Sequence, residues 1–126
     1  MKNPCVYILC SDAYGTFYIG VTSDLAKRMA EHTQGLYDGF TKKYGIKQLA
    51  YYEHHETMDL AIAREKLLKR WERPWKYRII EAMNPAWRNL YNPITGEIEE
   101  APAYADRLGA EPVRDFGSGG SPPSRG

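Results

Sequence analysis

The N-terminal part of the chain alternates between short apolar runs and polar turns. Residues 4–10, PCVYILC, are β-branched, aromatic and apolar, and this composition predicts a strand. In the following segment, SDAYGT, Asp12 and Gly15 suit the first and fourth positions of a type I turn. FYIGV at 17–21 then predicts the returning strand of a β-hairpin.

Helical spacing begins directly after the hairpin, in TSDLAKRMAEH. Leu25 and Met29 supply the buried stripe of this helix. Thr22 or Ser23 is expected to cap it, and Asp24 in the first turn complements the positive end of its dipole. The Gly-rich, Tyr-rich and basic segment that follows, GLYDGFTKKYG, shows little periodicity and is expected to be a loop.

Residues 47–55, KQLAYYEHH, predict a third strand, on which His54 and His55 would face opposite ways and are expected to be structural or surface residues. Thr57 is expected to cap a second helix, MDLAIAREKLLKRWE, that ends before Pro74. The residue before a proline is pushed out of helical geometry, so Arg73 is the expected boundary.

A short third helix is expected at about 74–83, stopping at Asn84, after which Trp87 and Leu90 fold back on the core. The order β-β-α-β-α-α predicts an α+β domain with a small antiparallel sheet over residues 1–92. Residues 93–126 are acidic and then rich in Gly, Ser and Pro, and they are expected to form a disordered tail.

Composition and length favour one soluble globular domain. The chain has 126 residues, of which 43% are hydrophobic and 26% charged. It has neither an apolar run of about 20 residues nor a secretory signal, so a cytoplasmic protein is expected. Cys5 and Cys10 would point to opposite faces of one strand, and no zinc-ligand spacing is present, so two reduced thiols are expected.

The net charge of +1 hides an uneven distribution. Between Arg64 and Arg78 there are seven basic residues and two acidic ones. This excess is compatible either with a polyanionic partner or with a solvated helical face, and charge alone does not separate the two.

Three groups of polar residues are not explained by core packing alone. In the expected hairpin register Tyr7 faces Gly20, so Tyr7 and Tyr18 become diagonal neighbours on one sheet face. Arg28 and His32, four residues apart, stack about 6 Å apart along one side of their helix. The alternatives are two aromatic core residues in the first case and two solvent-facing polar residues in the second.

The third case is Glu65. It falls inside the apolar stripe of the second helix, where a carboxylate costs several kcal/mol unless it is paired or binds a cation. The alternative is a salt bridge at the edge of the stripe. The residues that mark the stripe are Leu60, Ala61, Leu67, Leu68 and Trp71.

Together these residues suit metal-assisted phosphodiester hydrolysis. The acid would hold one Mg²⁺ and the arginine would stabilise charge on the phosphoryl oxygens. A tyrosine or the histidine could act as the base that activates water.

At this point the sequence resembles the GIY-YIG nuclease superfamily, in particular its small stand-alone bacterial members. The two triads are Cys5-Val6-Tyr7 and Tyr18-Ile19-Gly20, and the arginine, histidine and glutamate positions of the superfamily match Arg28, His32 and Glu65. The resemblance covers about residues 4–90. It implies a three-stranded antiparallel sheet flanked by helices and cleavage of DNA with a single Mg²⁺ (or Mn²⁺) ion.

The resemblance also implies roles. Tyr7 would be the general base or water activator, with His32 beside it, while Tyr18 would position the phosphate and Arg28 would stabilise it. Glu65 would be the sole protein ligand of the metal. A phenol with a pKa near 10 needs help from a cation or nearby positive charge to act as a base at neutral pH.

Two positions depart from the superfamily pattern: Val21 stands where some members have lysine, and Tyr77 where some have asparagine. Asn84 is only a weak candidate for the role of that asparagine. The residues expected to bind nucleic acid are Lys42, Lys43, Lys66, Lys69, Arg70 and Arg73.

Three functions remain open from sequence. The first is an endonuclease directed to branched, nicked, single-stranded or damaged DNA, as in DNA repair. The second is a nucleic-acid-binding module of the same fold that cleaves little by itself and acts with a partner. The third is a protein-interaction domain, which separate burial of Tyr18 and Arg28 would favour.

Overall fold

The protein folds around a three-stranded antiparallel sheet. The computed structural model describes residues 3–34 and 45–100. The strands are β1 (Cys5–Cys10), β2 (Phe17–Thr22) and β3 (Gln48–His54), in the spatial order β2-β1-β3. All six residues of the central strand β1 are buried. The α+β class and the predicted three-strand arrangement are therefore confirmed.

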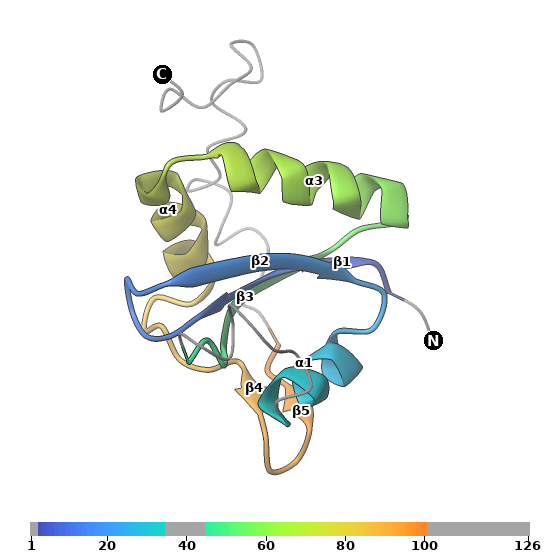
Figure 1. Cartoon of the computed structure of the whole chain (residues 1–126), viewed down its shortest axis with the longest axis vertical. Helices are drawn as coiled ribbons and strands as arrows, with labels where there is room; N and C mark the ends of the chain where they lie inside the picture. Colours follow the sequence, from blue (N-terminus) through green and yellow to red (C-terminus); the bar gives the residue numbers. More distant parts are fainter. Residues whose placement is uncertain (1–2, 35–44, 101–126) are drawn as a thin grey trace.

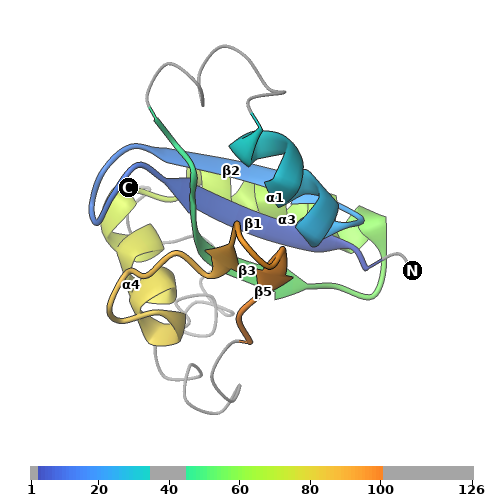
Figure 2. The same ribbon diagram turned by 90° about the horizontal axis from the view of Figure 1, so that it is seen from below.

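Helices cover both faces of the sheet (Figure 1). α3 (Met58–Arg70) and α4 (Arg73–Met83) lie on one face. On the other face lie α1 (Leu25–Thr33) and a small hairpin of β4 (Tyr91–Asn92) and β5 (Glu97–Ile98). The view in Figure 2 shows α1 and this hairpin on the near side of the sheet and α3 behind it.

The predicted β1–β2 hairpin is confirmed in its strands and register, but its turn is not the expected type I, because Tyr14, the third turn residue, has a φ of +60° where type I requires a negative φ. The Gly15 amide donates to the Asp12 carbonyl at 2.9 Å, which closes the turn. Tyr7 pairs with Gly20 and Leu9 with Tyr18, in the expected register. Because side chains alternate along a strand, Tyr7, Tyr18 and Gly20 share the sheet face that α1 covers.

Several element boundaries differ from the sequence prediction. The cap of α1 is Asp24, whose side chain accepts from the Lys27 amide, and not Thr22 or Ser23. Thr57 caps α3 as expected, but α3 ends at Arg70 because the buried Trp71 leaves helical geometry. Both Asp24 and Thr57 satisfy amides that the helix start leaves without an intrahelical acceptor.

The boundary at residue 92 is too early. β5 pairs with β4, the Glu99 amide donates to the Leu90 carbonyl at 2.7 Å, and the Tyr52 hydroxyl donates to the Glu99 carbonyl at 2.8 Å. Acidic composition led to the wrong boundary because these bonds use the backbone of residues 97–99 and not their side chains. Residues 101–126 of the predicted tail lie outside the described residues.

Trp87 and Leu90 fold back on the core as predicted, and the buried Asn84 holds the segment in this position. The Asn84 amide nitrogen donates to the carbonyls of Ala50 and Arg88, and its oxygen accepts from the Arg88 amide. All of its hydrogen-bonding atoms are therefore used inside the fold. Asn84 is a structural residue.

Both cysteine thiols, Cys5 and Cys10, are free and buried. Burial raises their pKa values to about 12 and about 11, so both stay protonated at neutral pH. Within the described part of the chain no helix has both the length and the apolar character needed to cross a bilayer.

Candidate active site

Gly20 makes room for the side chain of Tyr7. A Cβ atom at position 20 would lie 2.5 Å from the Tyr7 hydroxyl oxygen and 2.6 Å from the ring carbon that carries it. No real side chain tolerates such contacts, so the Tyr7 ring crosses β2 only because residue 20 has no side chain. The glycine of the second triad is thus a packing requirement for the tyrosine of the first.

α1 brings Arg28 and His32 to the same hydroxyl group. Leu25 and Met29 are buried under the helix, as predicted, and fix which of its sides faces the sheet. The Arg28 guanidinium donates to the Tyr7 hydroxyl oxygen at 3.3 Å, and His32 Nε2 lies 3.4 Å from the same oxygen. The expected stacking of Arg28 and His32 is therefore observed, with Tyr7 as their common partner.

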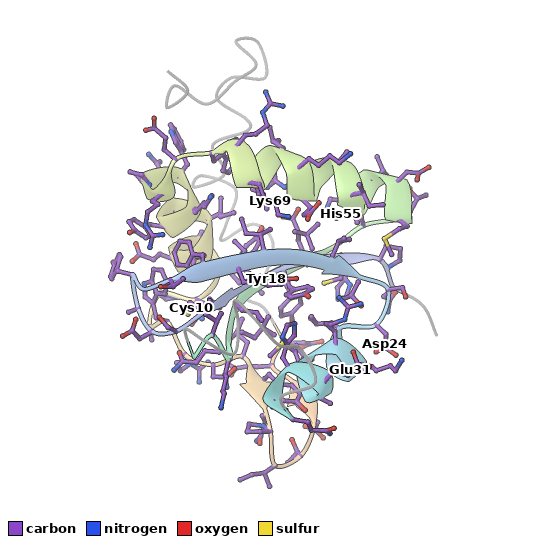
Figure 3. The ribbon with its side chains drawn as sticks, in the orientation of Figure 1. Cys10, Tyr18, Asp24, Glu31, His55 and Lys69 are labelled. Carbon is purple, nitrogen blue, oxygen red and sulfur yellow. The ribbon has the colours of Figure 1, made fainter. Side chains whose placement is uncertain are left out.

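Tyr18 completes what we term the tyrosine cluster, consisting of Tyr7, Tyr18, Arg28 and His32. The Tyr18 ring centroid lies 6.3 Å from that of Tyr7 and 5.7 Å from that of His32. Figure 3 labels Tyr18 on the α1 side of β2. Tyr7 and His32 are buried, whereas Tyr18 and Arg28 keep exposed surface. In this conformation Tyr18 and Arg28 are the members that can contact a ligand.

The electrostatics of the cluster favour a neutral imidazole. Burial and then the positive charge of Arg28 lower the pKa of His32, while Glu31 opposes this effect. Neutral His32 can accept the Tyr7 proton on Nε2 while Arg28 donates to the Tyr7 oxygen. This arrangement withdraws the phenol proton and stabilises the charge that its loss would leave.

Glu65 lies on the other face of the sheet, on α3. Ala61 and Leu68 on either side of it are fully buried, so it does fall within the apolar stripe. Leu60, which was expected to mark the stripe, is 52% exposed. The Glu65 side chain is only 14% exposed, and its carboxylate pairs with Lys69 Nζ at 2.6 Å. A salt bridge of the kind named above as the alternative is therefore present, and the role of Glu65 as a metal ligand stays a prediction.

The direction of Glu65 follows from its neighbour. Arg64 contacts Glu53 on β3, at 2.7 Å. Successive helical residues differ by about 100°, which places Glu65 on the opposite side of the Ala61–Leu68 line from Arg64. Glu65 is thereby directed towards β2, the strand at the other end of the sheet order.

The two halves of the site meet along β2. From the α1 side, Arg28 also donates to the Val21 carbonyl at 3.4 Å. From the α3 side, the helix that carries Glu65 packs against β2 and β1. The structure therefore brings four of the five predicted catalytic residues into one cluster and places the fifth, Glu65, on the helix that covers the other face of the sheet.

Comparison with known sequences shows to which family the chain belongs. Residues 3–78 match the GIY-YIG catalytic domain family. The chain belongs to this family. It is also 35% identical over 82 residues to the UPF0213 proteins SAV0488 of Staphylococcus aureus strain Mu50 and SA0446 of strain N315. That alignment covers 64% of this chain and 98% of each relative, so both are about as long as the domain itself. No solved structure matches the chain.

Membership of the GIY-YIG family indicates a nuclease that acts on DNA, and GIY-YIG nucleases are generally dependent on a divalent metal. Residues 3–34 and 45–100 contain no group of three or more His, Cys, Asp or Glu side chains that could enclose a metal ion. A single carboxylate such as Glu65 suits Mg²⁺ that is completed by phosphate oxygens and water. The donor set therefore fits an ion shared with a substrate and does not fit a closed structural site.

The predicted nucleic-acid-binding residues fall into three groups. Lys66, Lys69 and Arg70 lie exposed on α3. Arg73 instead donates to the carbonyls of the hairpin turn and stacks over Phe17, with its guanidinium carbon 4.4 Å from the ring centroid. Lys42 and Lys43 lie outside the described residues.

Sequence reasoning missed the partners that hold these groups in place. Glu31 lies 3.6 Å from the Arg28 guanidinium, and its i+3 spacing could have identified it. Glu53 anchors Arg64 and thereby orients α3. Glu53 belongs to a strand with an apolar face, and only the structure shows that it turns towards α3.

Proposed function

We propose that this protein is an endonuclease that hydrolyses DNA phosphodiester bonds with one Mg²⁺ or Mn²⁺ ion and is directed by DNA structure or damage more than by base sequence. The observation that carries the proposal is the convergence of Arg28 and His32 on the Tyr7 hydroxyl oxygen. Packing alone does not require a guanidinium, an imidazole and a phenol to meet at one atom.

The residues of the cluster divide the work of hydrolysis. Arg28, which keeps exposed surface, binds a phosphoryl oxygen and stabilises its growing negative charge. Tyr18, also partly exposed, orients the phosphate. The Tyr7 hydroxyl is buried in this conformation, so it acts as the base only once substrate binding brings the attacking water to it: Tyr7 then passes its own proton to His32 Nε2 and accepts one from the water, with Arg28 stabilising its oxygen.

Glu65 would hold the divalent ion, which supplies Lewis-acid stabilisation of the phosphate and of the leaving oxygen when bound. When no ion is bound, Lys69 pairs with the Glu65 carboxylate, because an ammonium group at 2.6 Å compensates the charge of a nearly buried acid. The exposed basic side chains of α3 contact phosphates. Such contacts give affinity without reading bases, so binding should weaken steeply as salt rises.

The test is cleavage of branched, nicked and single-stranded DNA by the purified protein with Mg²⁺ or Mn²⁺. The wild type is compared with Glu65→Gln and Arg28→Ala, and with Glu72→Gln, which removes an exposed carboxylate one helix boundary away. Wild type and Glu72→Gln should cleave, EDTA and Glu65→Gln should abolish cleavage, and Arg28→Ala should lower it about 10²- to 10³-fold. Equal cleavage by Glu65→Gln and wild type would remove Glu65 from the mechanism.

A second function, binding without efficient cleavage, is favoured by two observations. Val21 stands where some members of the superfamily have lysine. Tyr77 stands where some have asparagine, and its ring packs against Phe17 with 5.8 Å between centroids, so position 77 offers no amide to the site. Tight DNA binding by the wild type, with no cleavage in either Mg²⁺ or Mn²⁺, would establish this alternative.

The protein-interaction alternative loses its supporting observation. Separate burial of Tyr18 and Arg28 would have favoured it, but both residues keep exposed surface and belong to one cluster.

A further inference from the structure

The tip of the β1–β2 hairpin carries aromatic rings that the proposed cleavage reaction does not use. We term Tyr14, Phe17, Tyr77 and Trp87 the tip cluster. The Tyr14 ring centroid lies 4.8 Å from that of Tyr77 and 4.7 Å from that of Trp87. The Phe17 ring is nearly parallel to that of Trp87, with 6.1 Å between centroids. The cluster therefore joins the turn to α4 and to the segment after it.

Tyr14 has a backbone conformation that tyrosine rarely adopts. Its φ angle is +60°, in the left-handed region that glycine occupies without strain. Such strain persists only where the surrounding structure fixes the residue, and it is often found at binding sites. A glycine at position 14 would make the same turn more easily, so the ring needs a separate explanation.

The surroundings hold the Tyr14 ring firmly without burying it. The Tyr14 hydroxyl donates to the Glu81 carboxylate, and Arg73 donates to the carbonyls of Tyr14 and Gly15. Nevertheless Tyr14 is 54% exposed. Burial of apolar surface thus explains only part of the placement, and a fixed aromatic surface remains in contact with solvent.

The charges around the tip cluster suit a nucleobase better than a phosphate. Arg73 stacks on the Phe17 ring and brings a positive charge close to the rings. Glu81 accepts hydrogen bonds from both Tyr14 and the Trp87 indole, which hold its carboxylate in place while its negative charge remains at the tip. Asp12, exposed in the same turn, would repel a phosphate group placed directly at the tip.

We propose that the tip cluster binds an unpaired nucleobase of the DNA substrate, with the Tyr14 ring as the stacking surface. This inference rests on the proposed nuclease function. From Phe17 to Val21, where Arg28 reaches β2, the strand spans about 13 Å. At 3.4 Å per nucleotide in a duplex strand, this separation corresponds to about four nucleotides. Because Tyr14 lies beyond Phe17 at the turn, the preferred substrate carries an unpaired base at least about four nucleotides from the cleaved bond.

The test uses two variants that separate the ring from the turn. Tyr14→Gly removes the ring and tolerates a φ of +60°, so the hairpin is kept. Tyr14→Phe keeps the ring and loses only the hydrogen bond to Glu81. Binding is measured in EDTA by fluorescence anisotropy, on a forked DNA with an unpaired strand and on a fully paired duplex of equal length.

Tyr14→Gly should weaken binding to the fork about five- to 150-fold and leave duplex binding within about twofold. Tyr14→Phe should bind both DNAs like the wild type. A 2-aminopurine placed in the unpaired strand should be quenched by the wild type and by Tyr14→Phe but not by Tyr14→Gly, because quenching reports stacking directly.

Unchanged fork binding by Tyr14→Gly, or an equal loss on fork and duplex, would overturn the inference. These measurements need no cleavage. Failure of the nuclease proposal would appear as wild-type protein that cleaves nothing while still preferring the fork, so the two outcomes are distinguishable.

Discussion

Two clusters of the same residue types lie on opposite faces of the sheet, and they differ in what occupies their centre. Between β3 and α3, the Glu53 carboxylate accepts from Tyr51 at 2.5 Å and from Arg64 at 2.7 Å, and lies 2.8 Å from His55 Nε2. In the tyrosine cluster the central atom is a phenol oxygen, with longer contacts of 3.3 and 3.4 Å to Arg28 and His32.

This difference distinguishes polar residues that hold the fold together from those that can take part in a reaction. A largely buried carboxylate with short, charge-assisted bonds is strongly stabilised in one state, so the cluster of Glu53, Tyr51, Arg64 and His55 (the Glu53 cluster) fixes α3 against β3. The tyrosine cluster has a neutral centre, longer contacts and two partly exposed members, so its protons and partners can change. The shared residue types alone would not distinguish the two, because both contain tyrosine, histidine and arginine.

Removing the arginine from each cluster gives the largest expected contrast. Arg28→Leu should lower kcat about 10²- to 10³-fold with little change in the free energy of unfolding, because it removes stabilisation of charge on the phosphate. Arg64→Leu should instead destabilise the fold by about 3 kcal/mol, because it leaves the Glu53 carboxylate without its cation. Cleavage kinetics and urea unfolding of both variants measure the two effects.

Lys27→Leu is the control for this comparison, since it removes a neighbouring, largely exposed positive charge from α1. It should change neither quantity strongly. A loss of stability in Arg28→Leu as large as in Arg64→Leu would show that both clusters are structural.

The acid limb of the stability curve should depend on Glu53. Burial would raise the pKa of Glu53, but the bond to His55 and the charge and bonds of Arg64 outweigh it and lower the pKa to about 2. The folded state therefore binds fewer protons than the unfolded state between pH 4.5 and 2. Stability should fall by up to about 3 kcal/mol as the pH drops through this range.

Urea unfolding at a series of pH values measures this loss. Glu53→Gln should be less stable at neutral pH and should show a flatter pH dependence between pH 4.5 and 2. A variant that kept the full wild-type slope would mean that other carboxylates carry the acid sensitivity.

Gly20→Ala should damage the tyrosine cluster while sparing the Glu53 cluster. The new methyl group would occupy the space of the Tyr7 hydroxyl and push that ring away from Arg28 and His32. A displacement of about 1 Å can lower the rate about 10²-fold, whereas overpacking of one methyl group costs about 1–3 kcal/mol in stability. Cleavage assays combined with unfolding curves test this, and Gly20→Ser should behave similarly.

The hairpin register was predictable because it needed only the turn length and the alternation of strand side chains. Given Asp12 and Gly15 as turn ends, Tyr7 had to face Gly20, and the two tyrosines had to share a face. The four-residue spacing of Arg28 and His32 was equally local. Four of the five candidate catalytic residues could therefore be grouped without coordinates.

The position of Glu65 relative to them was not predictable from local spacing. It depends on which sheet face α3 covers, and both faces of β1 are equally apolar in sequence. The β4–β5 hairpin escaped prediction for a related reason: the backbone of Glu99 bonds to the Leu90 carbonyl and to the Tyr52 hydroxyl, and its carboxylate pairs with Arg88, all of them contacts between distant parts of the chain. Long-range pairing of this kind leaves no periodic pattern.

Removing the lysine partner of Glu65 should have the smallest effect of these changes, and it can be compared with the matching lysine on α1. Lys69 is 54% exposed, so its bond to Glu65 is worth only the fraction of a kcal/mol typical of such pairs. Since a divalent ion must displace this ammonium group, Lys69→Met should tighten Mn²⁺ binding about two- to fivefold in the absence of DNA. Titration calorimetry measures that affinity, with Glu65→Gln as the variant that should not bind.

Lys27→Met removes the same group from the equivalent i,i+4 pair with Glu31 on α1, and should leave Mn²⁺ affinity unchanged. Equal tightening in both lysine variants would attribute the effect to net charge and not to competition at Glu65.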